Sequence, residues 1–284
     1  MEIYINSAKA DIILESEKTL ADVLAGLDQW LSGSNPDYCA ACVAGDGFRL
    51  SGVIIDGKVI DAAAIDASLE RDISTIKTLN ILVSGISDLL YEALFFTIHV
   101  MSEFEKLDHG KKQHYCENWK ASPAAALIGE QTPQLYKIIA NAFIGNGFTP
   151  NEAASVIEEY MREIDNPSEE LQRMETDVAE ITSRLEELPL DIQTGKDRRA
   201  SETIQYFSTV AEKVLRLYAL MKAKYQAAAN IDISEFSAIL KEMIQAYETK
   251  DSIMVGDLAE YELAPRLRSL YNALNAVKTS QEGI

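Results

Sequence analysis

The residue types best suited to redox or metal chemistry stand in two short stretches. In the first, Cys39 and Cys42 are separated by two alanines, the spacing of redox dithiols and of half a zinc site. A redox pair needs a thiol of lowered pKa, usually at the start of a helix that follows a strand. This pair instead follows a helical pattern and lies in a connection that contains Gly and Asp. We therefore expect two small thiols without redox or metal function.

The second stretch holds His109, His114 and Cys116 beside Lys111 and Lys112. Their spacing matches no known zinc pattern, and the polar surroundings favour a solvated linker. Three cysteines in a chain of 284 residues do not form a disulfide framework, so reduced thiols are expected. The sequence thus predicts no metal and no cofactor.

No nucleophile, base and oxyanion donor stand together in the sequence, so no catalytic residue is predicted. An alternative function is an enzyme or small-ligand receptor with a pocket between two domains. Four cations would then be the candidates for binding an anion: Lys111, Lys112, Arg198 and Arg199.

The chain is strongly acidic, with 45 Asp and Glu against 26 Lys and Arg and a net charge of −19. Such a balance repels nucleic acids and anionic membranes, so neither is predicted as a partner. Carboxylates concentrate between Glu152 and Glu187. They form either a solvated helix face or an acidic surface that steers a basic protein partner. The residues proposed for this surface are Glu158, Glu159, Glu163, Glu169 and Glu170.

No apolar run approaches the roughly 20 residues that span a bilayer. The amino-terminal residues lack the basic start and small-residue cleavage site of a secretion signal. The sequence therefore predicts no membrane insertion and a cytoplasmic location.

The hydrophobic period changes near Gly85, from the pattern of a sheet to that of packed helices. Before this point, turn residues and alternating apolar residues predict two hairpins, one helix and a last strand. The expected strands cover residues 2–6, 10–15, 48–55, 58–60 and 79–83, and the expected helix covers residues 20–31. The predicted fold class is α+β, with a small domain at residues 1–84 and an all-α bundle of antiparallel helical hairpins at residues 85–284.

The first 84 residues resemble the ubiquitin-like β-grasp fold in their element order. The Ile-rich first hairpin and the helix that opens at Thr19-Leu20-Ala21-Asp22-Val23-Leu24 are similar to those of β-grasp sulfur carriers. Those carriers end in a free Gly-Gly whose carboxylate is activated. Here the strand ends at Ser84-Gly85 and continues into a helix, so the resemblance implies a binding module and not the carrier reaction.

Several helices of the second part are marked in the sequence. Residues 85–107 are predicted as one apolar helix, buried along Leu89, Leu90, Leu94, Phe95, Ile98 and Met101. A capping box at Thr149 and Glu152 opens another helix, and a further start follows Asn166-Pro167. A helical hairpin is repeated at a spacing of about 54 residues, with Lys196-Asp197 and Lys250-Asp251 at the two corners.

The run Gly256–Arg266 is acidic and aromatic. Leu258, Tyr261 and Leu263 are expected in the core, with Pro265 kinking or breaking the helix. This run and Gly195-Lys196-Asp197 resemble uncharacterised helical proteins of flagellated bacteria, which points to an export or motility context. The leading functional hypothesis is a non-enzymatic cytoplasmic adaptor or chaperone-like protein, which binds another protein through the acidic helices and the β-grasp domain.

Overall fold

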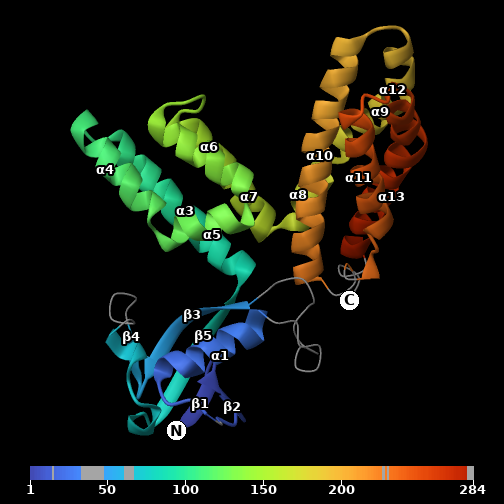
Figure 1. The fold of residues 1–284 in the computed structure, drawn as a ribbon. Helices are drawn as coiled ribbons and strands as arrows, with labels where there is room; N and C mark the ends of the chain where they lie inside the picture. The colour runs from blue at the N-terminus through green and yellow to red at the C-terminus, as the bar shows by residue number, and fades with distance from the viewer. Residues whose placement is uncertain (15, 33–47, 61–66, 226–227, 229, 280–284) are drawn as a thin grey trace. The chain divides into compact units, whose positions relative to one another are not determined.

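The computed structural model describes residues 1–14, 16–32, 48–60, 67–225, 228 and 230–279 (Figure 1). The fold is α+β, as predicted: a small amino-terminal sheet is followed by a long series of helices. The chain forms two compact units that divide between Met161 and Arg162. The sheet itself ends at Gly85, beside the domain boundary predicted at residue 84.

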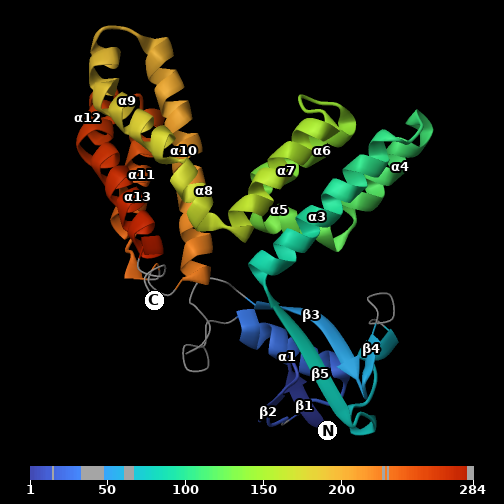
Figure 2. The same ribbon diagram turned by 180° about the vertical axis from the view of Figure 1, so that it is seen from behind.

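Five strands form the sheet in the order β2-β1-β5-β3-β4, with β1 and β5 parallel at its centre. They are β1 (Glu2–Ile5), β2 (Ala8–Ala10), β3 (Phe48–Ile55), β4 (Lys58–Ile60) and β5 (Thr78–Gly85). Helix α1 (Leu20–Ser32) lies against one face of the sheet (Figure 2). Apolar side chains of α1 such as Leu20 and Leu24 pack there with Leu79 and Ile81, and this contact forms the core of the sheet layer.

Both predicted hairpins are present. The Asp56-Gly57 turn between β3 and β4 is confirmed, with φ of +50° and +81° at its two residues. The first hairpin turns at Asn6-Ser7, and its second strand is Ala8–Ala10. The strand predicted at residues 10–15 was therefore wrong, because residues 11–14 are not in a strand and residue 15 lies outside the described residues. Asn tolerates the left-handed backbone. The Asn6 side chain also binds the backbone of Val83. Its Nδ2 donates to the Val83 carbonyl and its Oδ1 accepts from the Val83 amide, each at 2.9 Å.

The first unit continues into helices that pack on one another. They are α3 (Ile86–Glu105), α4 (His109–Lys120), α5 (Pro123–Gln131), α6 (Pro133–Ile144) and α7 (Pro150–Asp165), of which α7 runs into the second unit. The segment predicted as a solvated linker is helix α4, because Cys116 and Trp119 provide it with a buried side. The Trp119 indole stacks on Tyr136 and contacts Phe143.

The core side of α3 agrees with the prediction at most positions but not at Phe95; Leu89 and Ile98 are partly buried. Leu90, Leu94 and Met101 are buried, but Phe95 is 64% exposed. The buried face instead includes Thr97, whose hydroxyl donates to the carbonyl of Ala93 at 2.8 Å and accepts from the Trp119 indole at 3.2 Å. Because these bonds satisfy its hydroxyl, Thr97 can lie in the core, although it was not among the residues predicted to be buried.

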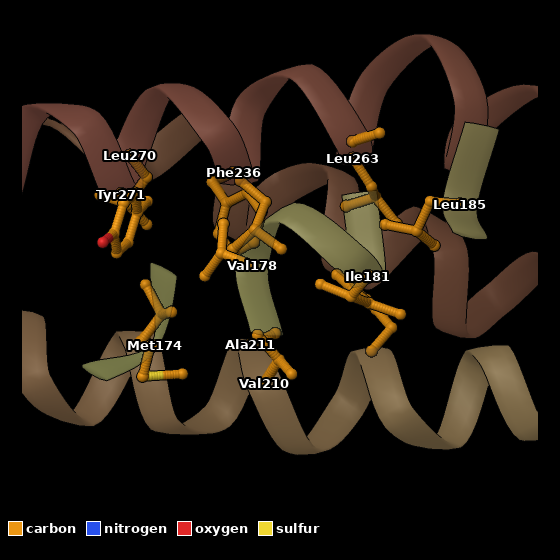
Figure 3. Close-up of a cluster of buried hydrophobic side chains, with 14 of the residues drawn as sticks. Met174, Val178, Ile181, Leu185, Val210, Ala211, Phe236, Leu263, Leu270 and Tyr271 are labelled. Carbon is orange, nitrogen blue, oxygen red and sulfur yellow. The ribbon is translucent and has the colours of Figure 1, made fainter. Parts of the chain in front are cut away.

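The second unit is a helical bundle. It contains α8 (Pro167–Arg173), α9 (Glu175–Gln193), α10 (Asp197–Lys224), α11 (Ser234–Glu248), α12 (Ser252–Asp257), a π-helical segment (Leu258–Leu263) and α13 (Ala264–Thr279). Helix α9 packs against α10, α12 and α13. Figure 3 shows Val178, Ile181 and Leu185 of α9 among side chains of the surrounding helices, such as Phe236 and Leu270.

The π-helical segment ends at Leu263, and Ala264 separates it from Pro265. Proline has no amide hydrogen to continue an α-helical ladder, and a π-turn adds a residue where the ladder is interrupted. The extra residue rotates the side chains that follow it. Leu258 and Leu263 are buried as predicted, but Tyr261 is 64% exposed, so its predicted core position was wrong.

The two corners that were predicted as a repeat share one backbone geometry. At the first, the left-handed residue is Gly195, and the amide of Lys196 donates to the Asp191 carbonyl at 2.8 Å. At the second, Lys250 is left-handed, and the amide of Asp251 donates to the Ala246 carbonyl at 2.9 Å. Both are Schellman-type helix ends. The equivalent positions are 55 residues apart, one more than the sequence echo indicated.

Candidate protein-binding surface

The five glutamates proposed as one acidic surface lie in two different environments. Glu158 and Glu169 are exposed and Glu159 is partly exposed, whereas Glu163 and Glu170 are buried. The prediction that all five face solvent was therefore wrong for Glu163 and Glu170. Residues that steer a partner must be reachable through solvent, so Glu163 and Glu170 are not part of a docking surface.

Glu163 is held by two cations of α10. Its carboxylate accepts from Nε of Arg216 at 2.8 Å and from Nη2 at 3.0 Å, while Nζ of Lys213 lies 3.5 Å away. A carboxylate that is only 1% exposed requires such partners, because an unpaired buried charge is strongly unfavourable. The two-bond geometry fixes the end of α7 against α10.

Glu170 of α8 extends this arrangement. Its Oε1 lies 2.7 Å from Nη1 of Arg173 and 3.6 Å from Nε of Arg162, and its Oε2 lies 3.9 Å from Nζ of Lys213. We call Arg162, Glu163, Glu170, Arg173, Lys213 and Arg216 the ion cluster. It connects α7, α8 and α10. Glu163 and Glu170 of the acidic segment therefore stabilise the fold and do not contribute to its exposed charge.

Most other carboxylates of the acidic segment also have partners in the fold. These pairs are Glu152 with Thr149, Glu169 with Arg173, Asp177 with Tyr206, Glu180 with Arg184, Glu186 with Arg268, and Glu187 with Arg199. Glu158 and Glu175 are exposed and form no ion pair with a described residue. The segment is therefore less available to a partner than its composition suggested.

The four cations proposed for anion binding are also placed by the structure. Lys111 and Lys112 belong to α4, and Nζ of Lys112 lies 5.0 Å from the centre of the Phe104 ring. Arg198 and Arg199 open α10 in the second unit and pair with carboxylates, Arg198 with Glu202 at 2.8 Å and Arg199 with Glu187 at 2.5 Å and Asp191 at 3.1 Å. Both arginines are thus already paired with carboxylates of the same chain.

Among the residues that the structure describes, those considered for metal or redox chemistry are not gathered into a site. Cys39 and Cys42 lie outside the described residues, and the Cys116 thiol is buried. Nε2 of His114 lies 3.3 Å from Nδ2 of Asn118 on the same helix. Within the described ranges, no group of three His, Cys, Asp or Glu residues could hold a metal ion. Over the same ranges, no helix combines the length and apolarity needed to cross a membrane.

Aromatic residues on α3 form a surface that the sequence reasoning missed. Phe95 is 64% exposed, Phe96 46% and Tyr91 37%, on the side of α3 away from Leu94 and Thr97. We call Tyr91, Phe95 and Phe96, together with Asp88 and Glu92, the α3 stripe. A helix that is apolar on all sides is normally buried all round. In α3, by contrast, the side that faces away from the core exposes large aromatic rings.

The acidic residues of α3 that share the exposed side with the aromatic residues are Asp88 and Glu92. Asp88 and Glu92 are exposed on α3 and form no ion pair with any residue that the structure describes. Helix α3 carries four carboxylates, Asp88, Glu92, Glu103 and Glu105, and no Lys or Arg. Among the residues that the structure describes, only Glu103 of these four has a cation partner, Lys106 at 2.8 Å. The α3 stripe therefore combines exposed aromatic rings with uncompensated negative charge.

Comparisons with known proteins match parts of the chain. A family model described as a domain of unknown function, DUF8042, matches residues 169–273, and the model of the TP0873 N-terminal domain matches residues 1–36. An uncharacterised protein of Treponema pallidum (strain Nichols) is 27% identical over 113 residues, which cover 37% of this chain and 56% of that protein. The matched region thus spans little more than half the length of that relative. No solved structure gives a significant match.

Proposed function

We propose that this protein is a non-enzymatic adaptor or chaperone-like protein that binds another protein through the α3 stripe. The observation that carries the proposal is the exposure of Phe95 and Phe96 beside unpaired carboxylates. Exposed aromatic rings grouped on one surface are typical of interaction sites, where they provide most of the binding energy. The neighbouring carboxylates would speed the approach of a basic partner.

The sheet would act as a second binding module. We propose that it belongs to the β-grasp class, supported by the order β2-β1-β5-β3-β4, the parallel pair β1 and β5, and helix α1 on one face. A cytoplasmic location and an export or motility context remain part of the proposal. They rest on the sequence features that suggested them.

Recovery of partners from an extract of the native cells tests the proposal. The full chain serves as bait, beside a variant that carries Asp88→Lys and Glu92→Lys. The matched control carries Glu158→Lys and Glu175→Lys, which change the charge by the same amount. Asp88 and Glu175 each lie in the first turn of a helix, so the two variants disturb helix starts alike.

The expected result is that the wild type and the control recover the same basic protein, while the α3 variant loses it. Recovery should also fall as salt shortens the screening length, which is about 8 Å at physiological ionic strength. Equal recovery by all three chains over the salt series would contradict a docking role for the α3 stripe.

A further inference from the structure

The α3 stripe restricts what kind of partner can bind to it. An α-helix satisfies its backbone hydrogen bonds within itself, so the exposed side of α3 offers only side chains. A partner cannot add a strand there, because strand addition needs the free edge of a sheet. Side-chain packing between helices, in which ridges of one fit into grooves of the other, is the contact that such a surface supports.

The spacing of the exposed side chains suits a helical partner. Tyr91 and Phe95 are four residues apart and lie on adjacent turns, and Phe96 widens the apolar surface at its side. His99 and Ser102, both exposed, continue the same side of α3 toward its carboxyl end. From Asp88 to Ser102 the surface is about 21 Å long at 1.5 Å per residue, or roughly four turns.

The charge of this surface determines which kind of helix can bind to it. Asp88 and Glu92 share the exposed side of α3 with Phe95 and Phe96, about two turns and one turn before them. They have no cation partner among the described residues, so an acidic helix would be repelled and a basic one attracted. We propose that the occupant of the α3 stripe is an amphipathic helix of a separate protein, with an apolar face bordered by Lys or Arg. This inference rests on the proposed function and names the class of its partner.

A synthetic peptide tests the inference directly. The probe is a labelled Leu–Lys peptide of about four helical turns, with leucines on one face, and its binding to the full chain is followed by fluorescence anisotropy. The test variant carries Phe95→Ala and Phe96→Ala. The control variant carries Ile244→Ala and Ile253→Ala, which remove exposed aliphatic side chains from α11 and α12. Thermal melting confirms that both variants are folded.

The inference predicts that the Leu–Lys peptide binds the wild type and the control equally, and the Phe95 and Phe96 variant about tenfold or more weakly. A Leu–Glu peptide of the same pattern should not bind, and a proline at the centre of the Leu–Lys peptide should abolish binding, since it breaks the helix.

Three results would overturn the inference: no binding of the Leu–Lys peptide to the wild type, equal binding to all variants, or equal binding of the proline peptide. If the peptide fails while partner recovery still depends on Asp88 and Glu92, the proposed function stands and the class of partner is wrong. If both experiments fail, the α3 stripe is not a docking site.

Discussion

Glu163 at the end of α7 and Arg216 in the middle of α10 form a two-bond ion pair, with N–O distances of 2.8 and 3.0 Å. The pair shows that a carboxylate of the acidic segment can stabilise the fold and does not only add negative charge to the surface. Glu163 is almost fully buried, whereas Arg216 keeps some contact with solvent. The free energy of such a pair depends on keeping both partners, because either one alone is a poorly solvated charge.

Glu163→Gln should therefore lower the free energy of unfolding by roughly 2 to 3 kcal/mol, since it removes the charge of a buried acceptor that faces two cations. Denaturant unfolding measures this change. The control is Glu158→Gln on the same helix, which should change stability by less than about 0.5 kcal/mol. Equal effects of the two substitutions would show that the ion cluster does not hold α7 and α10 together.

Two adjacent residues of α3 should respond differently to truncation. Leu94 is fully buried, so Leu94→Ala should lower the free energy of unfolding by about 2 to 5 kcal/mol. Phe95 is mostly exposed, so Phe95→Ala should change it by less than about 0.5 kcal/mol. Melting of the two variants measures both values. A large loss for Phe95→Ala would mean that its ring is packed within the chain.

Gly256 of α12 should not tolerate a larger side chain. A Cβ atom added there would lie 3.3 Å from both Cα and Cβ of Pro189 in α9. Gly256→Val should lower the free energy of unfolding by about 1 to 3 kcal/mol, as overpacking does. At Gly26 in α1 a Cβ atom meets nothing within 4 Å, so Gly26→Ala should stabilise by roughly 0.5 to 1 kcal/mol. Calorimetry can compare the two, and a stable Gly256→Val variant would argue against close contact of α9 and α12.

Tyr206 should make stability fall at high pH. Burial, followed by the hydrogen bond from its hydroxyl to Asp177 at 3.0 Å, raises the pKa of Tyr206 to about 12. An unfolded tyrosine ionises near a pKa of about 10. The stability that Tyr206 contributes is therefore complete below about pH 10 and is lost as the pH rises toward 12. Tyr206→Phe should reduce the slope of the free energy of unfolding against pH in this window. An unchanged slope would contradict the raised pKa of Tyr206.

Local signals predicted the start of several elements correctly. The Asp56-Gly57 turn requires positive φ angles that few other dipeptides adopt, and the capping box at Thr149 and Glu152 satisfies free amides at a helix start, with bonds of 2.8 and 3.2 Å. Such features depend on neighbouring residues only. They could therefore be identified without knowledge of the packing.

Positions decided by tertiary packing could not be predicted in this way. Thr97 is buried, and its hydroxyl accepts from Trp119, 22 positions along the chain, while Phe95 lies on the exposed side of the same helix. Glu163 looks like a surface residue in the sequence, since its main partner Arg216 is 53 positions away. Glu170 looks the same, because its ion pair with the adjacent-turn Arg173 is typical of an exposed helix face and its contact with Lys213 of α10 is distant in sequence. Tyr261 was misplaced because the π-turn before Pro265 changes the spacing of side chains. Each error came from a contact distant in sequence or from an irregular helix.

A docking role for the α3 stripe requires that Phe95 is exposed in the free chain and covered when the partner binds. Hydroxyl-radical footprinting of the full chain can measure the oxidation rates of Phe95 and of Ile253, with and without the protein recovered by the wild type. We expect both residues to be oxidised in the free chain, and the partner to protect Phe95 but not Ile253. Protection of Phe95 in the free chain, or equal rates with and without the partner, would contradict this docking role.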